Sequence, residues 1–213
     1  MAKVLYVSAN PGKEETSFSL SIGRHFLDAY KANNPGDEVI ELDLYKMSIP
    51  LIDSDVLSGW QALQKGAAFP SLSAASQQKI AAQNELTTQF VSADKYIFVS
   101  PMWSLGVPPL MKAYIDTLVK LGITYKNTSA GPVGLLEGKK GIHINARGLD
   151  YSGDLSALEF SDSYIRTIMR FMGIEMLDSI IAEGTVLASE KAEEIKQQAF
   201  RLSEAAAKLL ASA

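Results

Sequence analysis

Near its start the chain reads KVLYVSANPGKEETSFS (residues 3–19), and the predicted fold is built outward from this stretch. Lys3–Ser8 is a short apolar run rich in β-branched and aromatic residues, which predicts a buried strand. Asn10-Pro11-Gly12 is a strong turn signal. Apolar residues then recur every four positions, which predicts a helix; they are Phe18, Ile22, Phe26 and Tyr30.

Hydroxyl side chains open this helix, at Thr16, Ser17 and Ser19. The first N–H groups of a helix have no partner within it, and the helix dipole is positive at that end. A strand, a loop and such a helix therefore make a site for an anion. We interpret Thr16–Ser19 as the seat of a phosphate group. The simpler alternative is that Ser17 or Thr16 only caps the helix.

The composition excludes several classes of protein. The 213 residues are 47% hydrophobic, which is enough for a sizeable core in one domain, and the net charge is −4. An acidic chain lacks the electrostatic footprint of a protein that binds nucleic acid or an anionic membrane surface. No cysteine and only two histidines are present, so we expect no disulfide, no thiol nucleophile and no zinc site. We find neither a signal peptide nor a membrane-spanning stretch, and we expect a cytoplasmic protein.

Strand and helix patterns alternate along the chain. The remaining strands are predicted at Glu38–Leu44, Lys95–Ser100, Lys140–Ala146 and Ile174–Ala182. Helices are predicted at Ala74–Ser92, at Leu110–Leu121, after residue 153, and from an N-cap at Ser189 with Ile195, Ala199, Leu202, Ala206 and Leu209 on one face. Met47–Ser73 and Thr124–Lys139 are predicted as long loops, the first with a short helix that carries Trp60 and Leu63. Five alternating strands predict a single flavodoxin-like α/β domain over residues 1–213, with a parallel sheet of order 2-1-3-4-5 and helices on both faces.

Ligands of such sheets bind beyond the carboxyl ends of the strands, where the strand order reverses. The loops Ala9–Ser19, Met102–Gly106 and Ala146–Gly153 are expected to converge there. No G-x-G-x-x-G follows the first strand, and neither a P-loop nor a G-x-S-x-G elbow is present. His25 and His143 do not lie at strand ends, so we interpret both as packed or surface residues rather than general bases.

The second of these loops suits a flat, redox-active ring such as that of flavin mononucleotide (FMN). Met102–Leu105 offers backbone partners for the edge of a ring and apolar cover for its face. A cofactor of this kind carries the chemistry, so no catalytic residue of the protein is required. The alternative for Trp103 is ordinary packing of a loop aromatic.

The predicted helix Leu110–Leu121 is apolar over most of its circumference. Its charged residues Lys112, Asp116 and Lys120 lie on one line at four-residue spacing. Such a helix is buried on more than one side. One side packs on the sheet, and the other packs either on a second subunit or under loops of the same chain.

Across nearly its whole length the sequence resembles the FMN-dependent NADH:quinone oxidoreductases, also called FMN-dependent NADH-azoreductases. The resemblance is carried by Lys3-Val4-Leu5, Thr16-Ser17-Phe18-Ser19, Ser100-Pro101-Met102, Ala113-Tyr114-Ile115-Asp116, Gly122-Ile123-Thr124-Tyr125, Gly131-Pro132-Val133-Gly134-Leu135, Gly138-Lys139-Lys140, Arg147-Gly148, Phe171-Met172-Gly173-Ile174 and Ala182-Glu183-Gly184. It implies a flavodoxin-like homodimer with FMN near the subunit interface. It also implies a two-step turnover, in which NADH reduces the flavin and leaves before a quinone or an azo compound takes the electrons.

The resemblance also assigns site residues. It implies that Ser17, Phe18 and Ser19 bind the FMN phosphate, that Met102, Trp103, Ser104 and Leu105 line the ribityl chain and the ring, and that Ala146, Arg147, Gly148 and Leu149 close the far edge of the ring. Two stretches depart from the family, which commonly has Pro-Met-Tyr-Asn-Phe at 101–105 and Ser-Arg-Gly-Gly at 146–149. Two other functions stay open: a flavodoxin-type electron carrier and an NAD(P)H:FMN reductase that releases its flavin.

Overall fold

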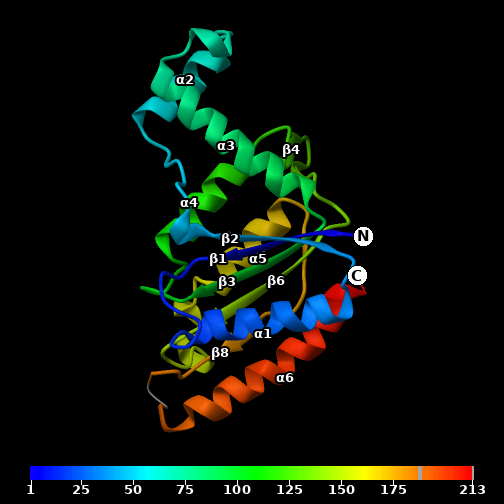
Figure 1. Cartoon of the computed structure of the whole chain (residues 1–213). Helices are drawn as coiled ribbons and strands as arrows, with labels where there is room; N and C mark the ends of the chain where they lie inside the picture. The colour runs from blue at the N-terminus through cyan, green and yellow to red at the C-terminus, as the bar shows by residue number, and fades with distance from the viewer. Residues whose placement is uncertain (187–188, 213) are drawn as a thin grey trace.

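A computed structural model describes residues 1–186 and 189–212 (Figure 1). Its main sheet is parallel and has the order β2-β1-β3-β6-β7, with β8 also paired to β6. The strands are β1 (Lys3–Ser8), β2 (Glu38–Asp43), β3 (Lys95–Pro101), β6 (Lys140–Ala146), β7 (Glu175–Met176) and β8 (Ile180–Ala182). The predicted parallel sheet and the predicted order of its strands are confirmed.

The prediction of one continuous fifth strand is wrong. Residues 174–182 form two short strands, β7 and β8, separated by Leu177–Ser179. The side chain of Arg166 donates to the carbonyl of Leu177 (2.6 Å) and to the hydroxyl of Ser179 (3.2 Å). The break is therefore held by a helix side chain that replaces partners in the sheet.

Two predicted loops contain regular structure. Within 124–139, β4 (Tyr125–Thr128) and β5 (Gly131–Gly134) form a separate antiparallel hairpin. Within 47–73, α2 (Ser54–Gln64) confirms the short helix expected at Trp60 and Leu63. Its N-cap is Asp53, whose carboxylate accepts the amides of Asp55 and Val56. Helix α2 packs on the first part of α3 (Ala74–Ser92) and projects beyond the sheet (Figure 1).

Helices cover both faces of the sheet (Figure 1). One face carries α1 (Phe18–Asn33) and α6 (Ala192–Ala211), and the other carries α3 (Ala74–Ser92), α4 (Pro109–Leu118) and α5 (Asp162–Phe171). Val4 and Tyr6 of β1 point to the α1 side, whereas Leu5 and Val7 point to the α3 side. Both faces of the parallel sheet are thus buried, as the apolar strands predict.

Helix α4 is covered largely by its own chain. Met111, Tyr114 and Leu118 are fully buried in the same core as α3 and α5. Coverage by the chain itself is therefore confirmed for this part of the helix, and the second subunit stays a prediction. At the other end of the chain, α6 begins at Ala192, after a 3-10 turn over Ser189–Lys191, rather than at Ser189.

Within residues 1–186 and 189–212, no helix combines the length and the apolar character needed to cross a membrane.

Candidate functional site at the carboxyl ends of the strands

The three predicted loops meet at the carboxyl edge of the sheet. The amide of Ala9 donates to the carbonyl of Val99 (2.9 Å), which ties the first loop to β3. The amide of Met102 donates to the carbonyl of Ala146 (2.8 Å), which ties the second loop to the end of β6. The predicted convergence is therefore present, at the position where the strand order reverses.

A polar cluster lies at the first turn of α1. The Asn10 amide donates to the hydroxyls of Ser17 (2.9 Å) and Ser19 (3.3 Å), and these two oxygens lie 3.2 Å apart. Ser17 is also the N-cap and accepts the amide of Leu20 (3.3 Å), so its capping role is confirmed, and its binding of a phosphate stays a prediction. Thr16 stays outside the cluster, because its hydroxyl points to the carbonyl of Lys13.

This cluster fits a phosphate group. It combines two hydroxyls and one amide with the first-turn amides of the helix, which have no helical partner. In the part of the chain that the structure describes, the amides of Phe18 and Ser19 donate to no protein acceptor. Neutral donors at a helix N-terminus are a common setting for a phosphate ester. Asn10 was missed from the sequence, where it counted only as part of a turn; its position two residues after the end of β1 was the available signal.

The second loop is a tight reverse turn. Trp103 and Gly106 exchange backbone hydrogen bonds of 2.9 and 3.0 Å. The two residues between them are left-handed, with φ of 48° at Ser104 and 68° at Leu105. Trp103 is 40% exposed and makes an edge-to-face contact with Tyr45, at 6.3 Å between ring centres. The turn therefore presents an aromatic and an apolar side chain at the surface of the site.

The loop after β6, at residues 147–149, presents backbone amides rather than a charged side chain to the candidate site. Arg147 is buried, and its guanidinium lies 2.8 Å from Glu183 and 3.2 Å from Glu159. Two carboxylates thus pair with the guanidinium of Arg147, the residue that the resemblance places at the far edge of a ring. Ala146 is buried, whereas Leu149 is partly exposed. Gly148 and Leu149 accept hydrogen bonds from Val186 and Gly184 through their carbonyls, and their own amides donate to no acceptor within 1–186 and 189–212.

Both histidines are packed, as predicted. His25 stacks on Phe200 with ring centres 4.1 Å apart, and its Nε2 lies 3.2 Å from Glu204. His143 is fully buried between Ser100 and Asp162, at 3.0 and 2.9 Å. Burial would raise the pKa of Asp162, but the hydrogen bond and charge of His143 outweigh it and hold that pKa below its usual value.

An apolar groove of about 390 Å³ borders the second loop. It is lined by Gly106, Val107, Lys112, Phe160, Ser163, Tyr164 and Thr167. Phe160 is 56% exposed, and its amide donates to the carbonyl of Leu105 (3.0 Å). The groove and the tight turn are therefore parts of one surface.

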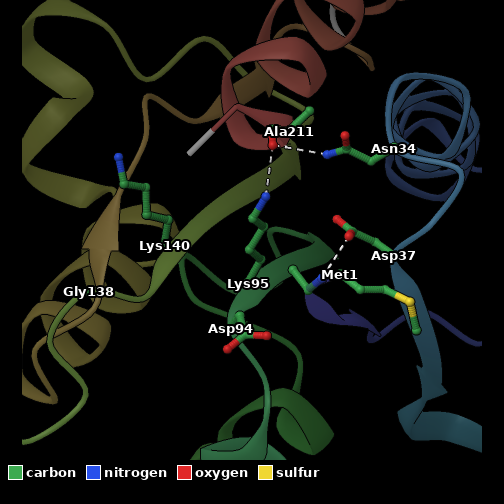
Figure 2. Close-up of a pocket in the computed structure, with 9 residues that line it drawn as sticks. Met1, Asn34, Asp37, Asp94, Lys95, Gly138, Lys140 and Ala211 are labelled. Atoms are coloured by element: carbon green, nitrogen blue, oxygen red, sulfur yellow. Dashed lines mark hydrogen bonds between the residues drawn. The ribbon is translucent and has the colours of Figure 1, made fainter.

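A second cavity, of about 310 Å³, lies at the opposite, amino edge of the sheet (Figure 2). There the side chains of Asn34 and Lys95 both donate to the carbonyl of Ala211 (3.0 Å each). The amide of Ala2 donates to Asp37 (2.7 Å). These contacts fasten the end of α6 to the sheet, so this cavity is remote from the candidate site.

A doubly wound sheet with a neutral anion seat and an apolar turn at its switch point defines a flavodoxin-like nucleotide-binding protein. Accordingly, a family model described as "Flavodoxin-like fold" matches residues 2–206. The FMN-dependent NADH:quinone oxidoreductase of Bacillus pumilus is 49% identical over 209 residues, which cover 98% of this chain and 99% of that protein. The chain belongs to the family of FMN-dependent NADH:quinone oxidoreductases.

Solved structures agree with this assignment. The crystal structure of an azoreductase from Bacillus anthracis str. Sterne has a TM-score of 0.90 at 36% identity, covering 98% of this chain and 99% of that one. A FMN-dependent NADH-azoreductase from Bacillus anthracis str. Ames Ancestor, solved in complex with FMN, has a TM-score of 0.92 at 31% identity and covers 99% of this chain and 100% of that one.

Proposed function

We propose that this chain is an FMN-dependent NADH oxidoreductase that reduces quinones and azo compounds in two steps. The observation that carries the proposal is the Asn10–Ser17–Ser19 cluster beside the exposed turn at 103–106, in a chain whose relatives are named for this activity. Bound FMN would supply the redox chemistry, which is hydride acceptance from NADH and electron delivery to the acceptor, and the residues of the chain would hold and orient it. We place this activity in the cytoplasm and in a single domain spanning residues 1–213.

The chain's own residues bind and orient the cofactor. Ser17, Phe18 and Ser19 hold the phosphate through hydroxyls and backbone amides, and Asn10 orients the hydroxyls. Met102, Trp103, Ser104 and Leu105 line the ribityl chain and one edge of the ring. Ala146, Arg147, Gly148 and Leu149 close the far edge of the ring. The donors there are the amides of Gly148 and Leu149, because the Arg147 guanidinium is already paired and the Arg147 amide donates to the carbonyl of Ala182. Backbone N–H groups stabilise the negative charge that a reduced flavin carries.

The resemblance implies a homodimer, and the groove beside Phe160 supports it. Phe160 lines this groove, Leu105 accepts its amide, and Leu155 and Leu158 lie in the 3-10 helix just before it. All four side chains are more than one third exposed. A cluster of this kind marks a contact surface. The second copy would cover the groove next to the ring edge, and the resulting prediction is argued in the Discussion.

The absorption spectrum of the purified protein tests the activity. We expect a yellow protein, or a colourless one that turns yellow with added FMN, that bleaches with NADH and regains its colour with menadione. Protein that binds no FMN contradicts the proposal. FMN bound without NADH oxidation would favour a flavodoxin-type carrier, and reduced FMN released into solution would favour an NAD(P)H:FMN reductase.

The phosphate seat is tested by Ser19→Ala. Ser19 is 1% exposed in the cluster, and losing one hydrogen bond to a charged group weakens binding about tenfold or more. We expect the Kd of FMN to rise while the Kd of riboflavin, which has no phosphate, is unchanged. Ser21→Ala, two residues further along α1, is the matched control. Equal losses for FMN and riboflavin would show that Ser19 does not bind the phosphate.

A further inference from the structure

Strand β6 carries a stripe of buried polar side chains on one face. Ile142, Ile144 and Ala146 belong to the core under α1 and α6. His143 and Asn145 alternate with them and therefore point to the opposite face, toward the start of α5. Both are 0% exposed. A central strand rarely buries polar side chains unless each has partners, so their contacts identify their role.

Asn145 joins three segments of the chain. Its Nδ2 donates to the carbonyl of Ser100 (3.0 Å), two residues before Met102, and to the hydroxyl of Ser161 (2.9 Å) at the start of α5. Its Oδ1 accepts from Nε of Arg147 (2.8 Å). Both ends of the amide are thus used, on the β3 side and on the β6 side of the candidate site.

Arg147 extends this junction to two more loops. Its remaining nitrogens pair with Glu159 and Glu183. The Glu159 carboxylate also accepts the amide of Ser161 (2.7 Å), and that of Glu183 accepts the amide of Tyr151 (3.3 Å). The loops that border the site are therefore connected through one buried polar centre.

We propose that Asn145 is a positioning residue, which sets the spacing between the turn at 102–105 and the loop at 147–149. This inference rests on the proposed function, because these two segments are the walls assigned to the flavin ring. A side chain with both a donor and an acceptor is required, since one amide bridges a carbonyl and a guanidinium. Asn145 itself is fully buried, so it would act through Ser100 and Arg147 rather than by direct contact with the ring.

The location of the junction predicts which part of the cofactor it serves. The phosphate cluster is formed by Asn10 and the first turn of α1, and neither makes a hydrogen bond to Asn145. Loss of the junction should therefore weaken binding of the ring and leave the phosphate seat intact. A residue that only stabilised the fold would not distinguish the two.

The test compares FMN with lumiflavin, which has the ring but no ribityl phosphate. We expect Asn145→Ala to raise the Kd of both ligands by the same factor, about tenfold, because buried partners lose their hydrogen bonds. Hydrogen–deuterium exchange in the flavin-free full chain should accelerate at 102–105 and at 147–149. Ser161→Ala removes only one contact and should raise both Kd values by a smaller common factor, which keeps the test valid if Asn145→Ala does not fold.

Thr87→Val is the matched control. Thr87 is 2% exposed, and its hydroxyl donates to a carbonyl of α3 and to a carbonyl of α4. The variant therefore loses a comparable buried hydrogen bond at a place away from the candidate site. It should lower the Tm without changing either Kd. Unchanged lumiflavin binding in both site variants, or a loss confined to FMN, would overturn the proposal. A wild-type chain that binds no flavin would instead overturn the proposed function.

Discussion

Ser104 and Leu105 show how single residues depart from their preferred backbone at this site. An L-residue with positive φ costs about 1–2 kcal/mol, and glycine is the usual residue there. The two residues keep this conformation because Trp103 and Gly106 close the turn and Phe160 donates to the carbonyl of Leu105. Strain of this kind concentrates at ligand sites, where surrounding contacts hold it. The departure from the family in this loop thus falls on the most constrained backbone.

Glu41 gives a prediction about pH at the scale of one residue. Its carboxylate accepts from Arg24 (2.7 Å) and from Lys31 (2.8 Å). The hydrogen bond from Arg24 is the main cause that lowers the pKa of Glu41 in the folded chain. The unfolded chain therefore binds this proton more readily, so the ion pair stabilises the fold above about pH 4.3 and is lost as the pH falls through the lower, folded pKa.

We expect Glu41→Gln to lower the free energy of unfolding at pH 7 by at most about 1 kcal/mol, since the pair is partly exposed and screened. The difference from wild type should shrink as the pH falls below about 4.3, through the lowered pKa of Glu41 in the folded chain. Urea titrations across this range measure it. Glu85→Gln removes an exposed carboxylate on α3 and serves as control. A difference that stays constant with pH would contradict the ion-pair account.

At the scale of elements, α6 shows that the periodicity of apolar residues predicts the buried face of a helix only approximately. The sequence predicted Leu202 and Leu209 on the buried face, yet they are 48% and 62% exposed. The buried residues are Ala199, Ser203, Ala207 and Leu210. Small side chains let α6 approach α1 closely, so close packing selects the small-residue face over the one with larger leucines.

The hairpin β4–β5 gives a prediction at the same scale. A Cβ atom on Gly134 would lie 2.2 Å from the amide nitrogen of Gly173 and 2.3 Å from the carbonyl carbon of Met172. Backbone cannot move aside as a side chain can, so Gly134→Ala should lower the free energy of unfolding by about 3 kcal/mol. Gly36→Ala, where a Cβ meets nothing within 4 Å, should change it by less than about 0.5 kcal/mol. Similar urea midpoints for the two variants would contradict the close approach.

For the whole molecule, the exposed groove beside the site predicts association of two copies. Phe160 is the most exposed large apolar side chain in the cluster with Leu105, Leu155 and Leu158. Burying a phenylalanine contributes about 1.5–3 kcal/mol, so a charge in its place should raise the dissociation constant of a dimer more than tenfold.

We expect the wild-type chain to have the mass of a dimer by light scattering and Phe160→Asp to shift it toward the monomer. Leu209→Asp is the control, because Leu209 is equally exposed but lies on α6, across the sheet from the groove. A wild-type monomer, or a dimer that tolerates Phe160→Asp, would contradict this interface.

Local sequence patterns predicted most of the architecture. The parallel sheet, the order of its strands and helix α3 at Ala74–Ser92 were confirmed at the level of whole elements. Residues 3–19 predicted the strand, loop and helix that carry the anion seat. These features depend on side-chain periodicity, turn residues and capping, which act over a few neighbours along the chain and can be read without knowing the fold.

The polar junctions needed the tertiary structure. Arg147 pairs with Glu159 and Glu183, and Asn145 meets Ser100, across separations of 12 to 45 residues. Which charge meets which depends on the strands and loops that become neighbours, and no local pattern carries that information. The same is true of the split between β7 and β8, where Arg166 on a helix takes a carbonyl from the sheet. The periodicity of apolar residues predicts where helices and strands form, with their backbone hydrogen bonds. Only the folded chain brings polar groups that are distant in sequence within reach of one another.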